Sequence, residues 1–332
     1  MNNNADILPE FSMPLVFMFS GQGSHHFHMA QNLYQEHEGF RKHLQNLDIL
    51  ALKYLNCSII EKIYDSNLKK DIPFTDIHFS HPALFSIQCA LAKSIMDCGI
   101  TPDMVLGYSI GEFVASVIAG VLTVESGFFL VCKQAELIER YCPQGAMTAI
   151  LETPDLYYTL PIFQEKVDLA GINYSRHFVV SGGIRPIEHI GAFCLQNQID
   201  FQDLPVTFAF HSDMMDPAYD EFIRFSSAIN FAGPKIRMIS GLDGLVTSLV
   251  NAYYLWNATR KAVFFNHVIR RLEQQGPNLY LDLGPSGTLA TFIKYNLDKC
   301  SQSRYCSLIN EFSLGMDICT INQRQLKTAN FC

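Results

Sequence analysis

The chain has 332 residues, of which 48% are hydrophobic and 17% are charged. This composition supplies a sizeable core and excludes wholesale disorder. A net charge of −8 at pH 7 argues against a nucleic-acid-binding protein. Because the ten cysteines form no C-x-x-C pair, neither a zinc ribbon nor a thioredoxin-type site is expected.

Three short apolar runs predict buried strands that end at glycine-rich turns: residues 15–19, 101–106 and 279–283. Helices are predicted between them, at 29–47, from His81-Pro82 onwards, and after Gly111 with a break near Gly120. Strands that alternate with helices favour a parallel α/β core, whose functional groups gather at the carboxyl ends of the strands.

The pattern of predicted elements changes near residue 146, where short strands become frequent. Three short strands are predicted at 146–151, 167–173 and 177–183, and a helix follows at 186–197. The order strand, helix, strand, strand, helix, strand is that of a ferredoxin-like unit. We therefore expect a small subdomain at 146–205, inserted into a large subdomain formed by residues 1–145 and 206–332.

Transport signals are not apparent in the sequence. The first residues, MNNNADILPE, lack the basic and apolar regions of a signal peptide. No uninterrupted apolar run reaches the ~18 residues that a membrane-spanning helix needs. We therefore expect a cytoplasmic protein with reduced thiols and no membrane association.

The segment GYSIG, residues 107–111, places Ser109 in a Gly-x-Ser-x-Gly motif between a predicted strand and a predicted helix. In such a turn the glycines leave room for a tight bend, the serine projects from it, and the following amides face a developing oxyanion. The motif alone also fits a simple glycine turn with a capping serine, but its context favours a nucleophile.

A nucleophilic serine needs a base, and eleven histidines compete for that role. His25, His26 and His28 share one loop, but no carboxylate or cysteine completes a metal-ligand spacing, so no metal is expected. His211 ends the apolar run VTFAF and begins a polar stretch. A histidine at a strand end is well placed to reach a serine at another strand end.

Five segments together resemble the malonyl-CoA:acyl-carrier-protein transacylases and the acyltransferase domains of polyketide and fatty-acid synthases. They are FSGQGS at 19–24, HPALF at 81–85, GYSIGE at 107–112, AFHSDMM at 209–215 and LDLGPSG at 281–287. Their order and spacing match the family over most of the chain. The resemblance implies an α/β-hydrolase-like large subdomain with a parallel sheet and a ferredoxin-like small subdomain.

The resemblance also implies a mechanism in which a serine takes an acyl group from a thioester. Ser109 would be the nucleophile and His211 the base. An acyl carrier protein would be the partner, and the acyl group would arrive on its phosphopantetheine or on CoA, with no bound cofactor. The family's remaining positions fall on Gln22 and Ile110 for the oxyanion-hole amides, Phe264 for a carbonyl that orients the base, and Asn173 in the cleft.

The sequence departs from malonyl-specific relatives at the position of their carboxylate-binding arginine. Gln134 stands there, and the neighbouring Lys133 should face elsewhere because successive helix positions point ~100° apart. An amide cannot form the bidentate ion pair that arginine makes with a carboxylate. Phe208 stands where histidine is common before the base, which makes the pocket more apolar. Further departures are Tyr108 in place of histidine, and His25 and His81 in place of glutamine.

These departures favour an uncharged acyl group and leave two activities open. The protein could hydrolyse acyl groups stalled on carrier proteins, as related proteins that lack the arginine do in trans beside polyketide synthases. It could instead transfer acetyl or another simple acyl group, with malonyl less favoured. Two other classes are weighed against these: an ordinary esterase, which expects an acidic triad member, and an inactive carrier-protein-binding module. A basic C-terminal third, including Arg270 and Arg271, is a candidate carrier-docking face.

Overall fold

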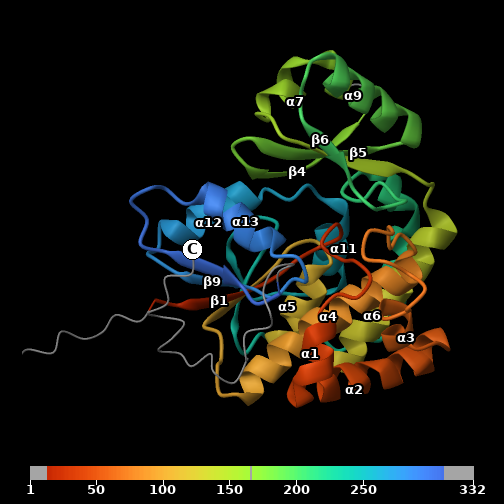
Figure 1. Ribbon diagram of the computed structural model, residues 1–332, viewed down its shortest axis with the longest axis vertical. Coiled ribbons are helices and arrows are strands. Elements are labelled where there is room, and N and C mark those ends of the chain that lie inside the picture. The colour runs from red at the N-terminus through yellow and green to blue at the C-terminus, as the bar shows by residue number, and fades with distance from the viewer. Residues whose placement is uncertain (1–12, 165–166, 310–332) are drawn as a thin grey trace, which may run out of the picture.

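The computed structural model describes residues 13–164 and 167–309. The N-terminal residues used for the targeting expectation, and both ends of the expected large subdomain, lie outside these ranges. Figure 1 shows a small subdomain set above a larger one. We propose residues 146–205 as the bounds of the small subdomain.

A six-stranded sheet forms the centre of the large subdomain, in the order β10-β9-β1-β2-β7-β8. Neighbouring strands are parallel except for the edge pair β7 and β8. The three strands predicted from the sequence are its centre, so the parallel α/β core is confirmed. The strands are β1 (Leu15–Phe19), β2 (Met104–Gly107), β7 (Arg237–Ile239), β8 (Val246–Thr247), β9 (Leu279–Asp282) and β10 (Arg304–Ser307).

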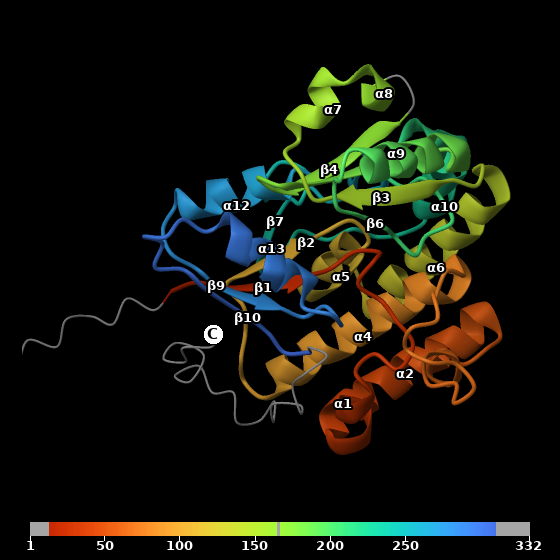
Figure 2. The same cartoon turned by 45° about the horizontal axis from the view of Figure 1, so that its top comes forward.

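Strand β1 is buried on both faces because helices cover both sides of the sheet (Figure 2). Phe17 and Phe19 point into the larger apolar cluster, under the helices of the first half of the chain. Val16 and Met18 point into the second cluster, under α12 (Phe265–Glu273) and α13 (Thr288–Asn296). The uninterrupted apolar run of β1 is the pattern expected for a central parallel strand.

The remaining helices of the large subdomain differ from the sequence prediction at two places. The predicted helix at 29–47 is two helices separated at His37. The helix predicted to start at His81-Pro82 begins earlier, because the Asp76 side chain accepts from the N–H of His78 and caps it. These helices are α1 (Gln31–Glu36), α2 (Glu38–Leu55), α3 (Ile59–Ile63), α4 (Ile77–Asp97), α5 (Gly111–Ile118), α6 (Val124–Tyr141), α10 (Tyr219–Ser226), α11 (Ala252–Arg260) and the 3₁₀ helix η1 (Asp213–Ala218).

The small subdomain is an antiparallel four-stranded sheet in the order β4-β5-β3-β6. This order, with helices after the first and third strands, is the ferredoxin-like arrangement, so that expectation is confirmed. Its elements are β3 (Ala146–Ile150), α7 (Asp155–Thr159), α8 (Pro161–Gln164), β4 (Asp168–Tyr174), β5 (His177–Gly182), α9 (Ile184–Gln196) and β6 (Phe201–Asp203).

One set of backbone hydrogen bonds closes the entry and exit of the small subdomain, and a second set joins the two subdomains. The segments that enter and leave the small subdomain pair with each other, with the N–H of Gly145 donating to Thr207 and a bridge between Gln144 and Phe208. Strand β4 also pairs with Val263 of the large subdomain. We call the first set, residues 144–147 and 204–208, the paired hinge. Within the described ranges, no helix has the length and apolarity needed to cross a membrane.

Candidate active site

Ser109 lies in the turn between β2 and α5, as the motif predicts. Its φ of 56° is in the left-handed region, which costs a residue with a side chain about 1–2 kcal/mol. The flanking glycines are required by space: a Cβ on Gly107 would lie 2.4 Å from the backbone nitrogen of Glu112, and one on Gly111 would lie 2.0 Å from the carbonyl oxygen of Phe19. The turn therefore holds the serine hydroxyl at the end of the strand.

The imidazole of His211 reaches this hydroxyl. Its Nε2 lies 2.9 Å from Oγ of Ser109, and its Nδ1 lies 2.7 Å from the carbonyl oxygen of Lys261. A carbonyl can only accept, so Nδ1 carries the ring proton and Nε2 is free to accept the proton of the serine. This is the tautomer that a general base needs.

The carbonyl that orients His211 belongs to Lys261, so the prediction of Phe264 was wrong. The carbonyl of Phe264 accepts from the N–H groups of His267 and Val268 in the first turn of α12. This carbonyl is therefore already used by hydrogen bonds within the helix. A backbone acceptor leaves no side-chain signature in a sequence, which is why the prediction missed by three residues.

Burial controls the protonation of His211. The residue is only 6% exposed, and desolvation lowers its pKa to about 4 against the opposing effect of the Lys261 carbonyl. The ring is therefore neutral at pH 7 and ready to accept a proton. No carboxylate among the described residues contacts it: buried Glu112 instead accepts from the N–H of Gly241. The acidic triad member expected of an ordinary esterase is not part of this arrangement.

Gln22 lies in the loop after β1, and Ile110 lies in the turn after β2. Neither backbone N–H has an acceptor among the described residues. Gln22 lines the same cavity as Ser109, and Ile110 follows Ser109 directly. Both amides are available for an oxyanion, and their role stays a prediction.

The Ser109 hydroxyl opens into a cavity of about 220 Å³ between the two subdomains. None of its described wall residues is arginine, lysine, aspartate or glutamate. The walls do contain two histidines, His177 and His211, and desolvation lowers the pKa of each to about 4. The cavity wall is therefore electrically neutral at pH 7.

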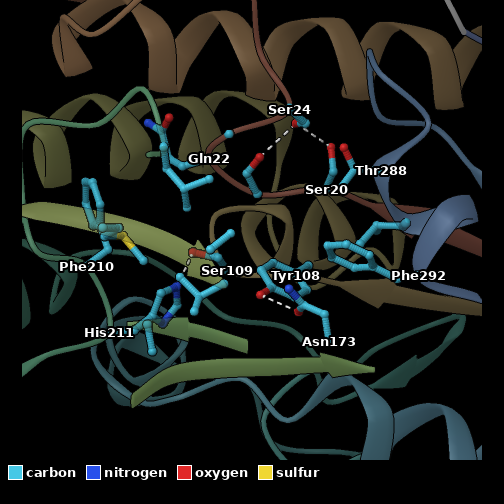
Figure 3. Close-up of a pocket in the computed structure, with 18 of the residues that line it drawn as sticks. Ser20, Gln22, Ser24, Tyr108, Ser109, Asn173, Phe210, His211, Thr288 and Phe292 are labelled. Carbon is cyan, nitrogen blue, oxygen red and sulfur yellow. Dashed lines mark hydrogen bonds between the residues drawn. The ribbon is translucent and has the colours of Figure 1, made fainter. Parts of the chain in front are cut away.

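Figure 3 shows how the labelled residues surround Ser109. Phe210 lies on one side of the serine, and Asn173, Thr288 and Phe292 lie on the other. Tyr108 lines the wall next to the nucleophile and donates to Oδ1 of Asn173 across 2.9 Å. The structure thus brings these two predicted cleft residues to the site. His177 also lines the cavity, and sequence reasoning missed it because nothing but its spacing of four from Asn173 marked it.

Gln134 and Phe208 were predicted as acyl-pocket residues, but neither is part of the described cavity wall. Gln134 is buried behind the base, where its Nε2 donates to Oγ1 of Thr259 across 2.8 Å. The carbonyl of Thr259 in turn accepts from the N–H of His211. Phe208 belongs to the paired hinge, where its backbone pairs with Gln144, and it does not line the cavity. Gln134 therefore contacts the segment that holds His211 rather than the cavity.

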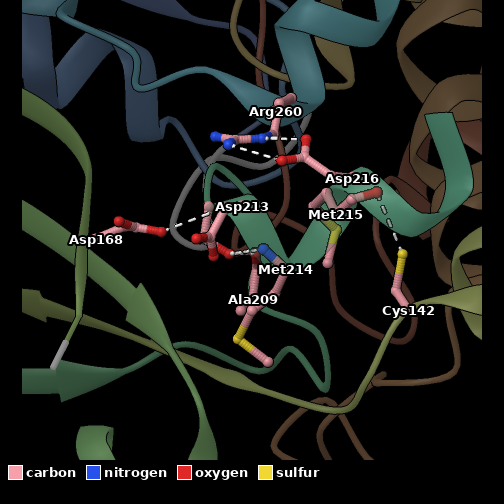
Figure 4. Close-up of polar contacts among 9 residues, drawn as sticks. Cys142, Asp168, Ala209, Asp213, Met214, Met215, Asp216 and Arg260 are labelled. Carbon is pink, nitrogen blue, oxygen red and sulfur yellow. Dashed lines mark hydrogen bonds and ion pairs between the residues drawn. The ribbon is translucent and has the colours of Figure 1, made fainter.

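The segment after His211 is fixed by polar contacts, shown in Figure 4. The Ser212 hydroxyl accepts from the N–H of Met214, and the Asp168 carboxylate of β4 accepts from the N–H of Asp213. Arg260, at the end of α11, forms two hydrogen bonds with Asp216. These contacts hold the start of η1, and hence the base, against both subdomains.

The histidine loop after β1 is occupied with backbone carbonyls. His25 contacts the carbonyl of Phe74, and His28 contacts that of Leu68, each through Nε2. Across the described ranges, no group of three or more metal-ligating side chains is placed to hold an ion. These two imidazole rings therefore stabilise the loop through backbone contacts.

Residues 16–327 match the family described as the acyl transferase domain. The chain belongs to this family. Among its relatives, the polyketide biosynthesis acyltransferase homolog PksD of Bacillus subtilis is 41% identical, over 90% of this chain and 92% of that protein. The homolog BaeD of Bacillus velezensis is 36% identical, over 91% and 93%.

Solved structures of acyl transferase domains also resemble the whole described fold. The acyltransferase domain from the second module of the salinomycin polyketide synthase is 29% identical, with a TM-score of 0.80. The alignment covers 92% of this chain and 70% of that one. Family membership supports an enzyme that acts on acyl thioesters.

Proposed function

We propose that this protein is a serine enzyme that removes uncharged acyl groups from acyl-carrier-protein thioesters and passes them to water. The observation that carries the proposal is the Ser109–His211 pair, which opens into a cavity with neutral walls. Similarity to the polyketide biosynthesis homologs PksD and BaeD supports polyketide assembly as the setting. The enzyme would clear carrier proteins that hold an unproductive acyl group.

Acylation uses the two hydrogen bonds of His211. As Oγ of Ser109 attacks the thioester carbonyl carbon, its proton moves to Nε2 of His211. The oxyanion accepts hydrogen bonds from the N–H groups of Gln22 and Ile110. The C–S bond then breaks, the thiolate takes the proton from the imidazolium, and the acyl group remains on Oγ as an ester.

Deacylation repeats the sequence with water as the nucleophile. His211 takes a proton from water, the hydroxide attacks the ester carbonyl, and the C–O bond to Ser109 breaks. The serine oxygen recovers its proton from the imidazolium, and a carboxylic acid is released. The cavity of about 220 Å³ is lined in part by the hydroxyl and amide side chains of Ser20, Gln22 and Ser24, so it has room and hydrogen-bond partners for water after the thiol leaves.

The preference for uncharged acyl groups follows from the walls of the cavity. A malonyl carboxylate would lose its hydration there without meeting a cation. Leaving a buried charge without its partner costs about 2–5 kcal/mol, or roughly 30-fold to several thousand-fold in affinity. Gln134, at the position of the family's arginine, adds only an amide that already donates to Thr259.

Transfer to a second thiol is the alternative activity, and family membership supports it. An enzyme of this kind would take acetyl or another simple acyl group from a carrier protein or CoA. It would form the same acyl-serine and differ only in the group that attacks the ester. An inactive carrier-binding module would have no use for the tautomer that Lys261 imposes on His211, so that reading is disfavoured.

Intact-mass spectrometry with acetyl-, butyryl- and malonyl-loaded carrier proteins tests the proposal. We expect free acid and unloaded carrier from the acetyl and butyryl substrates, little reaction with malonyl, and none with Ser109→Ala. Release of acyl groups only when a second carrier thiol is added would instead establish transfer. Faster loading from malonyl than from butyryl carrier would overturn the proposed cargo.

A further inference from the structure

A chain of hydrogen bonds crosses the cavity wall beside Ser109, and the chemistry described above does not use it. Tyr108 donates to Oδ1 of Asn173 across 2.9 Å, and Nδ2 of Asn173 lies 3.0 Å from Nδ1 of His177. All three side chains line the cavity. The chain runs from the nucleophile turn of the large subdomain to strands β4 and β5 of the small one.

These contacts decide which nitrogen of His177 carries the proton. An amide nitrogen can only donate, so Nδ1 accepts and the ring proton lies on Nε2. Desolvation lowers the pKa of His177 to about 4, which keeps this neutral form at pH 7. The contact with Asn173 uses Nδ1, and within residues 13–164 and 167–309 no hydrogen bond is made by Nε2. It is an unused donor on a cavity-lining side chain.

The donor is also held rigidly. The His177 ring packs against the rings of Tyr174 and Phe292, with centroid distances of 5.0 and 5.3 Å. The carbonyl of Asn173 accepts from Nδ2 of Asn296 across 2.7 Å. A donor fixed in this way loses little conformational entropy when it binds a ligand.

A thioester that reacts at Ser109 would extend its two halves to the two sides of the cavity. Phe210 lies on one side of Ser109, whereas Asn173 and Thr288 lie on the other (Figure 3). A thioester divides at its carbonyl into an uncharged acyl chain and a pantetheine arm, which carries two amides and a dimethyl group. Phe292, on the polar side, offers an apolar surface to that dimethyl group.

We propose that Nε2–H of His177 donates a hydrogen bond to an amide carbonyl of the pantetheine arm. The Tyr108–Asn173–His177 chain fixes the tautomer that makes this bond possible, so His177 is a specificity residue for amide-bearing thioesters. The inference rests on the proposed function in taking Ser109 as the point where the thioester reacts. It does not depend on whether water or a thiol collects the acyl group.

The test varies the thiol while the acyl group stays constant. Butyryl thioesters of pantetheine, N-acetylcysteamine and ethanethiol carry two, one and no amides. For His177→Phe, which keeps a ring but loses the donor, we expect KM for butyryl-pantetheine to rise about tenfold, with kcat nearly unchanged. KM for the ethanethiol ester should not change, and His177→Gln, which keeps a side-chain N–H, should recover part of the loss.

Binding gives a readout that needs no chemistry. Calorimetric titration of free pantetheine should show about tenfold weaker affinity for His177→Phe than for the wild type. On the wild type, pantetheine should bind more tightly than an analogue in which uncharged E-alkenes replace the two amides and so remove the carbonyl acceptors. This comparison needs no variant, so it can be made even if His177→Phe fails to fold.

Two outcomes would overturn the inference: an equal change for all three thiols, or no change in any of them. If no thioester acylates Ser109 while pantetheine affinity still depends on His177, the proposed function fails and the binding site stands.

Discussion

Nε2 of His211 lies 2.9 Å from Oγ of Ser109, and both residues hold left-handed backbone conformations, with φ of 61° and 56°. Ser109 follows a strand of the large subdomain, whereas His211 follows the paired hinge. The contact between the Ser109 hydroxyl and the His211 imidazole therefore depends on two unfavourable backbone conformations being maintained at once.

The strain at Ser109 predicts a gain in stability when the side chain is removed. Under the proposed mechanism Ser109→Ala and Ser109→Gly should both abolish acylation, but only glycine relieves the positive φ. We expect Ser109→Gly to be more stable than Ser109→Ala by about 1 kcal/mol, measured by denaturant unfolding. Equal stabilities would mean that the turn relaxes when the hydroxyl is absent.

The low pKa of His211 sets the acid limit of activity. The base must be neutral, and with a pKa of about 4 it stays neutral down to that pH. We expect kcat/KM for acylation to be level between pH 8 and pH 5 and to fall by half near pH 4. A limb near pH 6.5 would show that His211 is more hydrated than its burial indicates.

Buried His81 predicts a loss of stability in acid. Its ring nitrogens have no partner within the described ranges, and desolvation lowers its pKa to about 3. The unfolded chain takes up this proton below about pH 6.5 and the folded chain does not, so protonation favours unfolding as the pH falls. His81→Gln should lose less unfolding free energy between pH 6.5 and pH 4 than the wild type, by up to about 1.4 kcal/mol per pH unit. Parallel pH dependences of the two proteins would count against this account.

The contact between Gln134 and Thr259 predicts an effect on the base rather than on the choice of cargo. Gln134→Leu and Thr259→Val each remove the same hydrogen bond, and Thr259 also holds the N–H of His211. We expect each to lower kcat by roughly fivefold to tenfold, and the double variant to be little worse than either, as in a double-mutant cycle. An acyl preference shifted towards malonyl would show instead that Gln134 meets the acyl group directly.

A carrier-docking face is predicted on α12, where Arg270 and Arg271 are exposed. Carrier proteins are acidic, so Arg270→Glu with Arg271→Glu should raise KM for acyl carrier protein severalfold at low salt. The KM for a small thioester should not change. The exposed pair Lys69 and Lys70, changed to glutamate, is the charge-matched control. An equal rise in KM from the two pairs would mean that overall charge, rather than docking at α12, causes the effect.

Side-chain chemistry made the central site predictable. The apolar run of β1, the glycines around Ser109 and the polar stop at His211 are constraints that the sequence displays. Contacts made by backbone atoms leave no such pattern in the sequence. The role of orienting His211, which belongs to the carbonyl of Lys261, was therefore predicted for the carbonyl of Phe264. Long-range pairing is equally hidden: nothing near Gln134 in the sequence indicates that Thr259 would take up its amide.

The small subdomain is connected to the surroundings of His211 at two places. The segment of the paired hinge that leaves the small subdomain continues from Phe208 into His211. Strand β4 pairs with Val263, two residues beyond the carbonyl that orients the imidazole. Because these contacts hold the segments that carry and orient His211, a displacement of the small subdomain would move the imidazole relative to the Ser109 hydroxyl.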